Sequence, residues 1–141
     1  MALNKTRIWL GGLAAGVVWN VWSYVINTYA IQNARYVAAQ NAGVFLKTSR
    51  YHFFVGWWIV LLFVLALIVA HLYAWTRQTL GAGPGNALRI GFWVGFLAGF
   101  PENFAQVNWL NASRALPVGW ALEMWLGAVL AAMVAGWIYK E

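Results

Sequence analysis

The chain has 141 residues, of which 63% are apolar and only 9% are charged, and its formal net charge is +6. A soluble domain carries about 25% charged residues, so this composition excludes a water-covered surface and indicates a membrane protein. The nine basic residues lie singly or in pairs at the ends of apolar runs, which is typical of membrane proteins and argues against a nucleic-acid partner. The sequence contains no cysteine, which excludes disulfides and thiolate metal sites.

Four apolar stretches each reach roughly the ~20 residues needed to cross the hydrocarbon core of a bilayer. They cover residues 8–30, 53–75, 87–110 and 117–139. Because backbone polar groups in lipid must be hydrogen-bonded within the protein, each stretch is predicted to be an α-helix. The first stretch is longer than the ~7–15-residue core of a signal peptide, so we interpret it as a retained helix. The sequence therefore predicts an all-α, polytopic four-transmembrane-helix bundle, with residues 1–141 as a single membrane domain.

The segments between these stretches differ in length and composition. Residues 31–52 form the longest one, and residues 35–43 within it are predicted to form a short interfacial helix. Three glycines and Pro84 between residues 81 and 85 predict a turn, and residues 111–116 predict a tight hairpin. Five basic residues fall on the side of the termini and four on the other side, which favours cytoplasmic termini in a bacterial inner membrane. The five are Lys5, Arg7, Arg77, Arg89 and Lys140, and the four are Arg35, Lys47, Arg50 and Arg114.

Small residues recur four positions apart in the first, third and fourth stretches. Helices in lipid associate through close packing of small residues, so these stripes predict the seams of a compact bundle. As an alternative, the stripe of the third stretch would contact another subunit. The predicted packing glycines are Gly12 and Gly16, then Gly91, Gly95 and Gly99, and finally Gly127.

Each stripe continues into polar residues that share one helical face and one leaflet, the leaflet away from the termini. This pattern predicts an intramembrane polar pocket between the first, third and fourth stretches, opening toward residues 31–52. Its predicted members are Asn20, Tyr24, Asn27, Glu102, Asn103, Gln106 and Glu123.

Glu102 directly follows Pro101 in the third stretch, where proline predicts a kink near Leu97. An ionisable residue at this depth is costly and is by default a hypothesis of function. One interpretation is a neutral network in which a glutamic acid bonds to Asn20 or Gln106. Another is proton or cation coupling through Glu102 and Glu123. A third is an ion pair, in which Arg114 reaches Glu123 from the hairpin.

His71 stands in residues 67–77, where an Ala-His pair precedes Trp75 and Arg77. This stretch of about a dozen residues resembles the pigment-ligating segment of light-harvesting β polypeptides. That resemblance implies a chlorophyll or haem ligand at His71, although Leu67 replaces the small residue expected one turn earlier. The alternative is an interfacial histidine without a ligand. No cofactor is otherwise predicted, and bound lipids are expected.

Catalytic chemistry is not predicted. His71 belongs to one leaflet and both carboxylates to the other, so a hydrolytic triad would have to span the membrane. Two histidines without cysteine also make no complete metal site.

Across its length the chain resembles an uncharacterised group of small bacterial four-helix membrane proteins. The stretches that carry the resemblance are residues 11–20, 73–89 and 136–141. The resemblance implies the architecture and no activity. The leading hypothesis is a structural or accessory subunit, with other membrane subunits or a second copy as partners. The alternatives are a small proton- or ion-coupled transporter and a tetrapyrrole binder.

Overall fold

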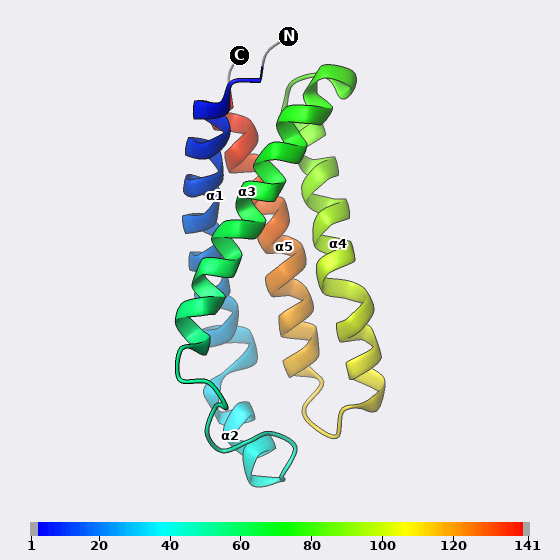
Figure 1. The fold of residues 1–141 in the computed structure, drawn as a ribbon. Coiled ribbons are helices and arrows are strands. Elements are labelled where there is room, and N and C mark those ends of the chain that lie inside the picture. The colour runs from blue at the N-terminus through cyan, green and yellow to red at the C-terminus, as the bar shows by residue number, and fades with distance from the viewer. Residues whose placement is uncertain (1–2, 140–141) are drawn as a thin grey trace.

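The computed structural model describes residues 3–139, and these residues are mainly helical (Figure 1). The all-α prediction is confirmed for this part of the chain. A short helix is present in the segment where the sequence predicted one, and it begins at Asn33. In chain order the elements are α1 (Lys5–Val25), the π-helical segment η1 (Ile26–Ile31), α2 (Asn33–Asn41), α3 (Phe54–Leu80), α4 (Pro84–Trp109) and α5 (Ala115–Ile138).

Within the described residues, three helical stretches, rather than the four predicted, are long and apolar enough to cross a membrane. They are Lys5–Ile31, which joins α1 to η1, Phe54–Leu80 and Ala115–Ile138. The remaining long helix, α4, matches them in length but is less apolar. Its second half carries the polar residues Glu102, Asn103, Gln106 and Asn108 together with Pro101.

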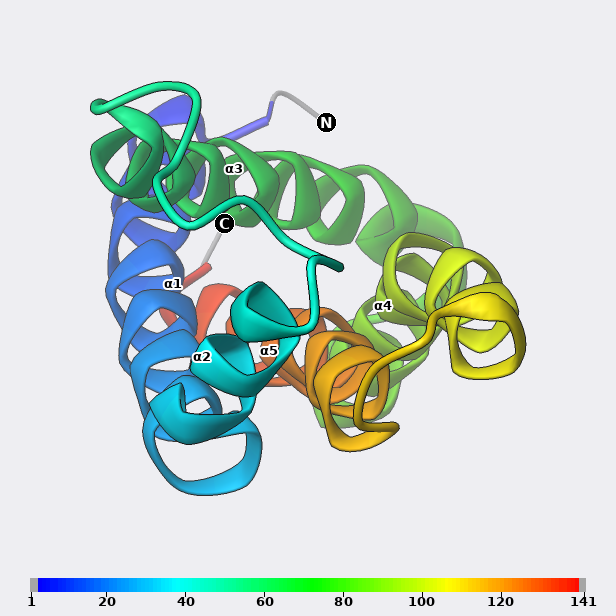
Figure 2. The same ribbon diagram turned by 90° about the horizontal axis from the view of Figure 1, so that it is seen from below.

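The four long helices run up and down along one axis, and α2 lies beyond them at the end away from the chain termini (Figure 1). Figure 2 shows α5 between α1 and α4, with α3 crossing above them. In agreement with this view, α5 packs against α1, α3 and α4. The helix that carries Glu123 therefore forms the centre of the bundle.

Tyr139 joins the helices at the end of the bundle that holds the termini. Its backbone carbonyl accepts a hydrogen bond from Arg77 Nη1 at 3.0 Å, and the Arg77 guanidinium lies 5.3 Å from the centre of its ring. Its hydroxyl lies 3.4 Å from the backbone nitrogen of Asn4, which donates to it. The first and last described turns are thus fixed beside each other.

The glycine stripe of α4 packs against α5 of the same chain. A Cβ atom added to Gly91 would lie 2.6 Å from the Cα atom of Val129, and one added to Gly95 would lie 2.5 Å from the carbonyl oxygen of Trp125. Gly99 has the same relation to Ala121, at 2.8 Å. The two backbones therefore touch along this seam, and the stripe is occupied without another subunit.

The other predicted glycines also face neighbouring helices. Gly12 and Gly16 of α1 lie against Leu67 and Phe63 of α3. Gly127 of α5 lies against the indole ring of Trp19, which is completely buried. All six glycines predicted for packing therefore stand at contacts between helices.

Two indole rings of α1 hold the turn of α5 that carries Glu123. Because Gly127 has no side chain, the Trp19 ring reaches the α5 backbone, and its Nε1 donates to the Glu123 carbonyl oxygen at 3.2 Å. Trp22 Nε1 donates to the neighbouring Leu122 carbonyl oxygen at 3.1 Å. These bonds fix the position of Glu123 without using its side chain.

Candidate functional site

A cavity of about 1160 Å³ lies in the half of the bundle away from the termini. α3 and α4 diverge in this half of the bundle (Figure 1). All seven polar residues predicted for a pocket line it: Asn20, Tyr24, Asn27, Glu102, Asn103, Gln106 and Glu123. Residues of α2 and α3 line it as well, so its wall includes two elements that the sequence did not assign to it.

Glu123 is the most deeply placed polar residue of the cavity wall, with only 2% of its surface exposed. Its Oε1 atom accepts hydrogen bonds from the Ser23 hydroxyl at 2.5 Å and from Trp58 Nε1 at 3.1 Å. Its Oε2 atom accepts one from Asn27 Nδ2 at 3.2 Å. The carboxyl group thus joins α5 to α1, η1 and α3, and all three donors are neutral.

The sequence prediction that Arg114 reaches Glu123 is wrong. Arg114 precedes the first turn of α5 and lies nine positions before Glu123, which is about 13 Å of helix. Within residues 3–139, the side-chain partners of Glu123 are the neutral donors named above.

Asn27 connects Glu123 to a second layer of polar groups. It lies in η1, where the Gln32 backbone nitrogen donates to the Asn27 carbonyl oxygen at 3.0 Å, a π-helical bond. The Tyr36 hydroxyl donates to Asn27 Oδ1 at 3.5 Å and accepts from Trp120 Nε1 at 2.7 Å. Short π-helical segments are rare and often occur at functional sites, where they reorient a side chain.

Burial raises the pKa of the Tyr36 hydroxyl in α2 above its ordinary value. The hydrogen bond from Trp120 lowers this pKa, and the negative charge of Glu123 raises it. Tyr36 therefore remains a neutral donor to Asn27 at physiological pH.

Glu102 occupies the exposed part of the cavity wall, on α4. Its Oε1 atom accepts a hydrogen bond from Gln106 Nε2 at 3.3 Å, as the sequence suggested. Asn20 instead donates to two backbone carbonyl oxygens, those of Gly16 at 2.9 Å and Ile59 at 3.4 Å. The two carboxyl groups therefore have separate partners in one cavity.

The rest of the predicted polar set differs in exposure. Asn103 is buried and donates to the Gly99 carbonyl oxygen at 2.7 Å, one helical turn earlier. Tyr24 is 70% exposed and forms part of the rim. α4 continues through Pro101 as one helix.

Comparison with protein-family models, curated proteins and solved structures found no match to this chain. The resemblance to a group of bacterial four-helix proteins therefore stays a prediction.

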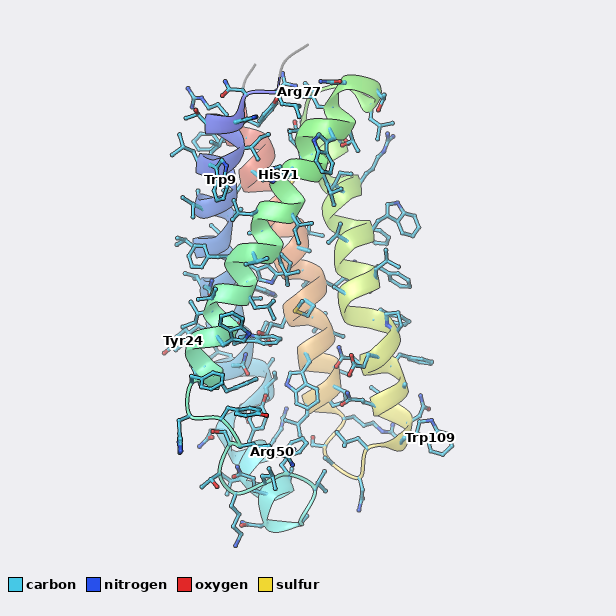
Figure 3. All side chains as sticks on the ribbon, in the orientation of Figure 1. Trp9, Tyr24, Arg50, His71, Arg77 and Trp109 are labelled. Atoms are coloured by element: carbon cyan, nitrogen blue, oxygen red, sulfur yellow. The ribbon has the colours of Figure 1, made fainter. Side chains whose placement is uncertain are left out.

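His71 lies outside this cavity, in the half of the bundle that holds the chain ends (Figure 3). Its Nδ1 atom lies 2.7 Å from the Leu67 carbonyl oxygen, and its ring meets the edge of Trp75 at 5.9 Å between centroids. With Nδ1 acting as the donor, Nε2 is the atom left for a ligand. Among the described residues, no group of three or more His, Cys, Asp or Glu side chains could hold a metal ion.

The sequence did not assign Ser23, Trp58, Tyr36 or Trp120 to the site. Ser23 had a usable signal, because it lies four positions before Asn27 and so shares its helical face. Trp58 had none, because a tryptophan near a helix end is typical of the membrane interface.

Proposed function

We propose that this chain is a small membrane transporter that binds a ligand in the cavity and couples its movement to a proton or cation at Glu123. The observation that carries the proposal is the buried carboxyl group of Glu123 on the wall of a large cavity. Charged groups are costly in a membrane interior and mark functional sites there. The three donors that orient this group are neutral, so they do not compensate a negative charge on the carboxylate. A proton or a cation that enters the cavity would compensate that charge.

We also propose that α4 is the fourth membrane-crossing helix. Large apolar residues are exposed along its length, whereas Glu102, Asn103 and Gln106 line the cavity. The exposed polar residues Arg89 and Asn108 lie toward its two ends. Polar residues that lower the hydropathy of a helix are tolerated in a membrane where they face a cavity. The large exposed apolar residues of α4 are Leu88, Phe92, Trp93, Leu97, Phe104 and Trp109.

The proposed setting is a bacterial inner membrane with both termini in the cytoplasm. The argument is the small excess of basic residues on the side of the termini. In this orientation the cavity opens toward the outer side of the membrane.

The proposal is tested by thermal unfolding of the purified protein with a panel of anionic, neutral and cationic hydrophobic compounds. At least one class is expected to raise the unfolding temperature, since a ligand at 100 times its Kd stabilises by about 2.7 kcal/mol. Glu123→Asp keeps the carboxyl group and should retain part of this effect, whereas Glu123→Gln should lose it. A stabilising compound should then enter proteoliposomes under a pH gradient.

Two results would overturn the proposal. The first is a panel in which no class stabilises the protein. The second is equal stabilisation of the wild type and Glu123→Gln.

A role as accessory subunit is the second candidate, and a row of stacked rings on α4 favours it. Phe92, Phe96, Phe100 and Phe104 follow one another at centroid distances of 6.4, 4.9 and 5.4 Å. Phe92, Phe96 and Phe100 also meet the ring of Trp125 on α5, and the exposed rings of Phe92 and Phe104 are left to contact a neighbouring membrane helix. Recovery of a stoichiometric partner from native membrane would support this role.

A tetrapyrrole binder is the third candidate, and it rests on the Nε2 atom of His71. An absorption spectrum of protein purified from its native membrane distinguishes it from the other two. Visible bands would support it, and their absence would exclude it.

A further inference from the structure

We infer that the ligand of this cavity is a hydrophobic organic cation, and this inference rests on the proposed function. The first observation is the charge of the wall. Glu102 and Glu123 line the cavity, and none of the described residues that line it is Lys, Arg or His. An anion would therefore meet two carboxyl groups and no positive charge, whereas a cation finds a complementary site.

The second observation is the aromatic character of two sides of the cavity. Tyr36, Phe45 and Trp120 form one cluster, with ring centroids 6.1–6.3 Å apart. On α3, Phe54 stacks on Trp58 at 6.1 Å. The faces of such rings attract cations, most strongly where water is excluded, and they provide apolar contact for the rest of an organic ligand. Both groups of rings belong to the wall that contains Glu123.

The two carboxyl groups lie at different distances from the opening of the cavity. Glu102 is exposed and, among the described residues, accepts a hydrogen bond from Gln106, whereas Glu123 is almost fully buried behind its three donors. A cation entering the cavity would meet Glu102 near the surface and Glu123 at the inner wall. Glu102 therefore provides an entry site for the cation, and Glu123 provides a deeper one.

The size and chemistry of the wall favour an organic cation over a metal ion. Metal ions such as calcium need about six or more oxygen ligands close together. The described residues contain no cluster of this kind, and the Glu123 oxygens already accept three hydrogen bonds. A cavity of about 1160 Å³ with mainly apolar walls instead matches the sites that bind small organic molecules.

Tetraphenylphosphonium and tetraphenylborate provide a direct test, because they have the same shape and opposite charge. Binding of each ion is measured by equilibrium dialysis of the protein in detergent, with empty micelles subtracted. The wild type is expected to bind the phosphonium at least tenfold more tightly than the borate. Glu123→Gln and Glu102→Gln should each weaken phosphonium binding at least tenfold.

Two further variants test the aromatic wall. Phe54→Leu removes a ring that lines the cavity without removing a hydrogen bond to Glu123, and it should weaken phosphonium binding several-fold. Trp93→Leu removes an exposed ring of α4 that lies outside the cavity, and it should leave the affinity unchanged. Because Glu102 is exposed, Glu102→Gln should fold even if Glu123→Gln does not.

Equal affinity for the two ions, or phosphonium affinity unchanged by Glu102→Gln, would overturn the inference. If anionic or neutral compounds stabilise the protein through Glu123 while the phosphonium does not bind, the ligand class is wrong and the transporter proposal survives. If no compound of any class stabilises the protein, both fail.

Discussion

Replacing Glu123 by leucine should lower the free energy of unfolding by about 2–4 kcal/mol, because the hydrogen-bond donors that surround the carboxyl group lose their acceptor. A buried donor without a partner costs about 1–3 kcal/mol. Ser23 is buried, whereas Asn27 and Trp58 are partly exposed to the cavity, where water can replace the lost acceptor. The total is therefore smaller than three full penalties. Unfolding in a denaturing detergent measures the loss.

A double-mutant cycle separates this effect from simple loss of packing. Ser23→Ala removes the buried donor, so Glu123→Leu should cost less in the Ser23→Ala background than in the wild type. The expected coupling is about 1–2 kcal/mol. Additive losses, or a Glu123→Leu variant as stable as the wild type, would mean that the carboxyl group does not hold α1, η1 and α3 to α5.

Replacing Gly95 by leucine should separate α4 from α5. Even the first atom of a side chain at Gly95 would lie 2.5 Å from the Trp125 carbonyl oxygen and 2.8 Å from its Cα atom. These are backbone atoms, so they cannot move aside as a flexible side chain would. We expect Gly95→Ala to cost about 1–3 kcal/mol, and Gly95→Leu to prevent stable folding. The unfolding transition of the purified variants provides the measurement.

Gly56 is the matched control, since it lies within α3 and an added Cβ would have no atom within 4 Å. Gly56→Ala should be neutral or slightly stabilising, because alanine favours helix by about 0.5–1 kcal/mol over glycine. Gly56→Leu should fold normally. Equal losses of stability at the two positions would show that the effect comes from replacing a glycine in a helix, rather than from the contact between α4 and α5.

Regular helix geometry explains why the seams and the polar set could be predicted. Residues four apart share a face, so the spacing of Gly91, Gly95 and Gly99 indicated a contact surface before any partner was known. Depth follows from position along a helix, and this placed Glu102 and Glu123 in the same leaflet. No such rule gives the rotation of one helix against another.

The incorrect predictions have two causes: the sequence does not reveal how one helix is rotated against another, and it does not reveal local changes of the backbone. Trp58 reaches Glu123 only because α3 crosses α1 at a particular angle. The π-helical turn that presents Asn27 has no sequence signal, and Arg114 was assigned to Glu123 because both lie near one interface. α4 was predicted to be an apolar span, but it is less apolar than the other long helices because the polar residues that face the cavity lower its mean hydropathy.

The central claim is that α4 crosses the membrane with one face toward lipid and the other toward a water-accessible cavity. Ala98 and Leu97 test it, because they are neighbours on α4 at the same depth. Ala98 lines the cavity, whereas Leu97 lies outside it and is 71% exposed. The chain contains no cysteine, so Ala98→Cys and Leu97→Cys each introduce one reactive thiol.

The measurement is the rate at which a water-soluble, membrane-impermeant thiol reagent labels each variant in vesicles of both orientations. The account predicts that Ala98→Cys reacts from the side of α2, that a cavity ligand slows this reaction, and that Leu97→Cys does not react. Rapid labelling of Leu97→Cys would place α4 in water and contradict the account. Protection of both thiols would contradict it as well, because the cavity would then be closed to water.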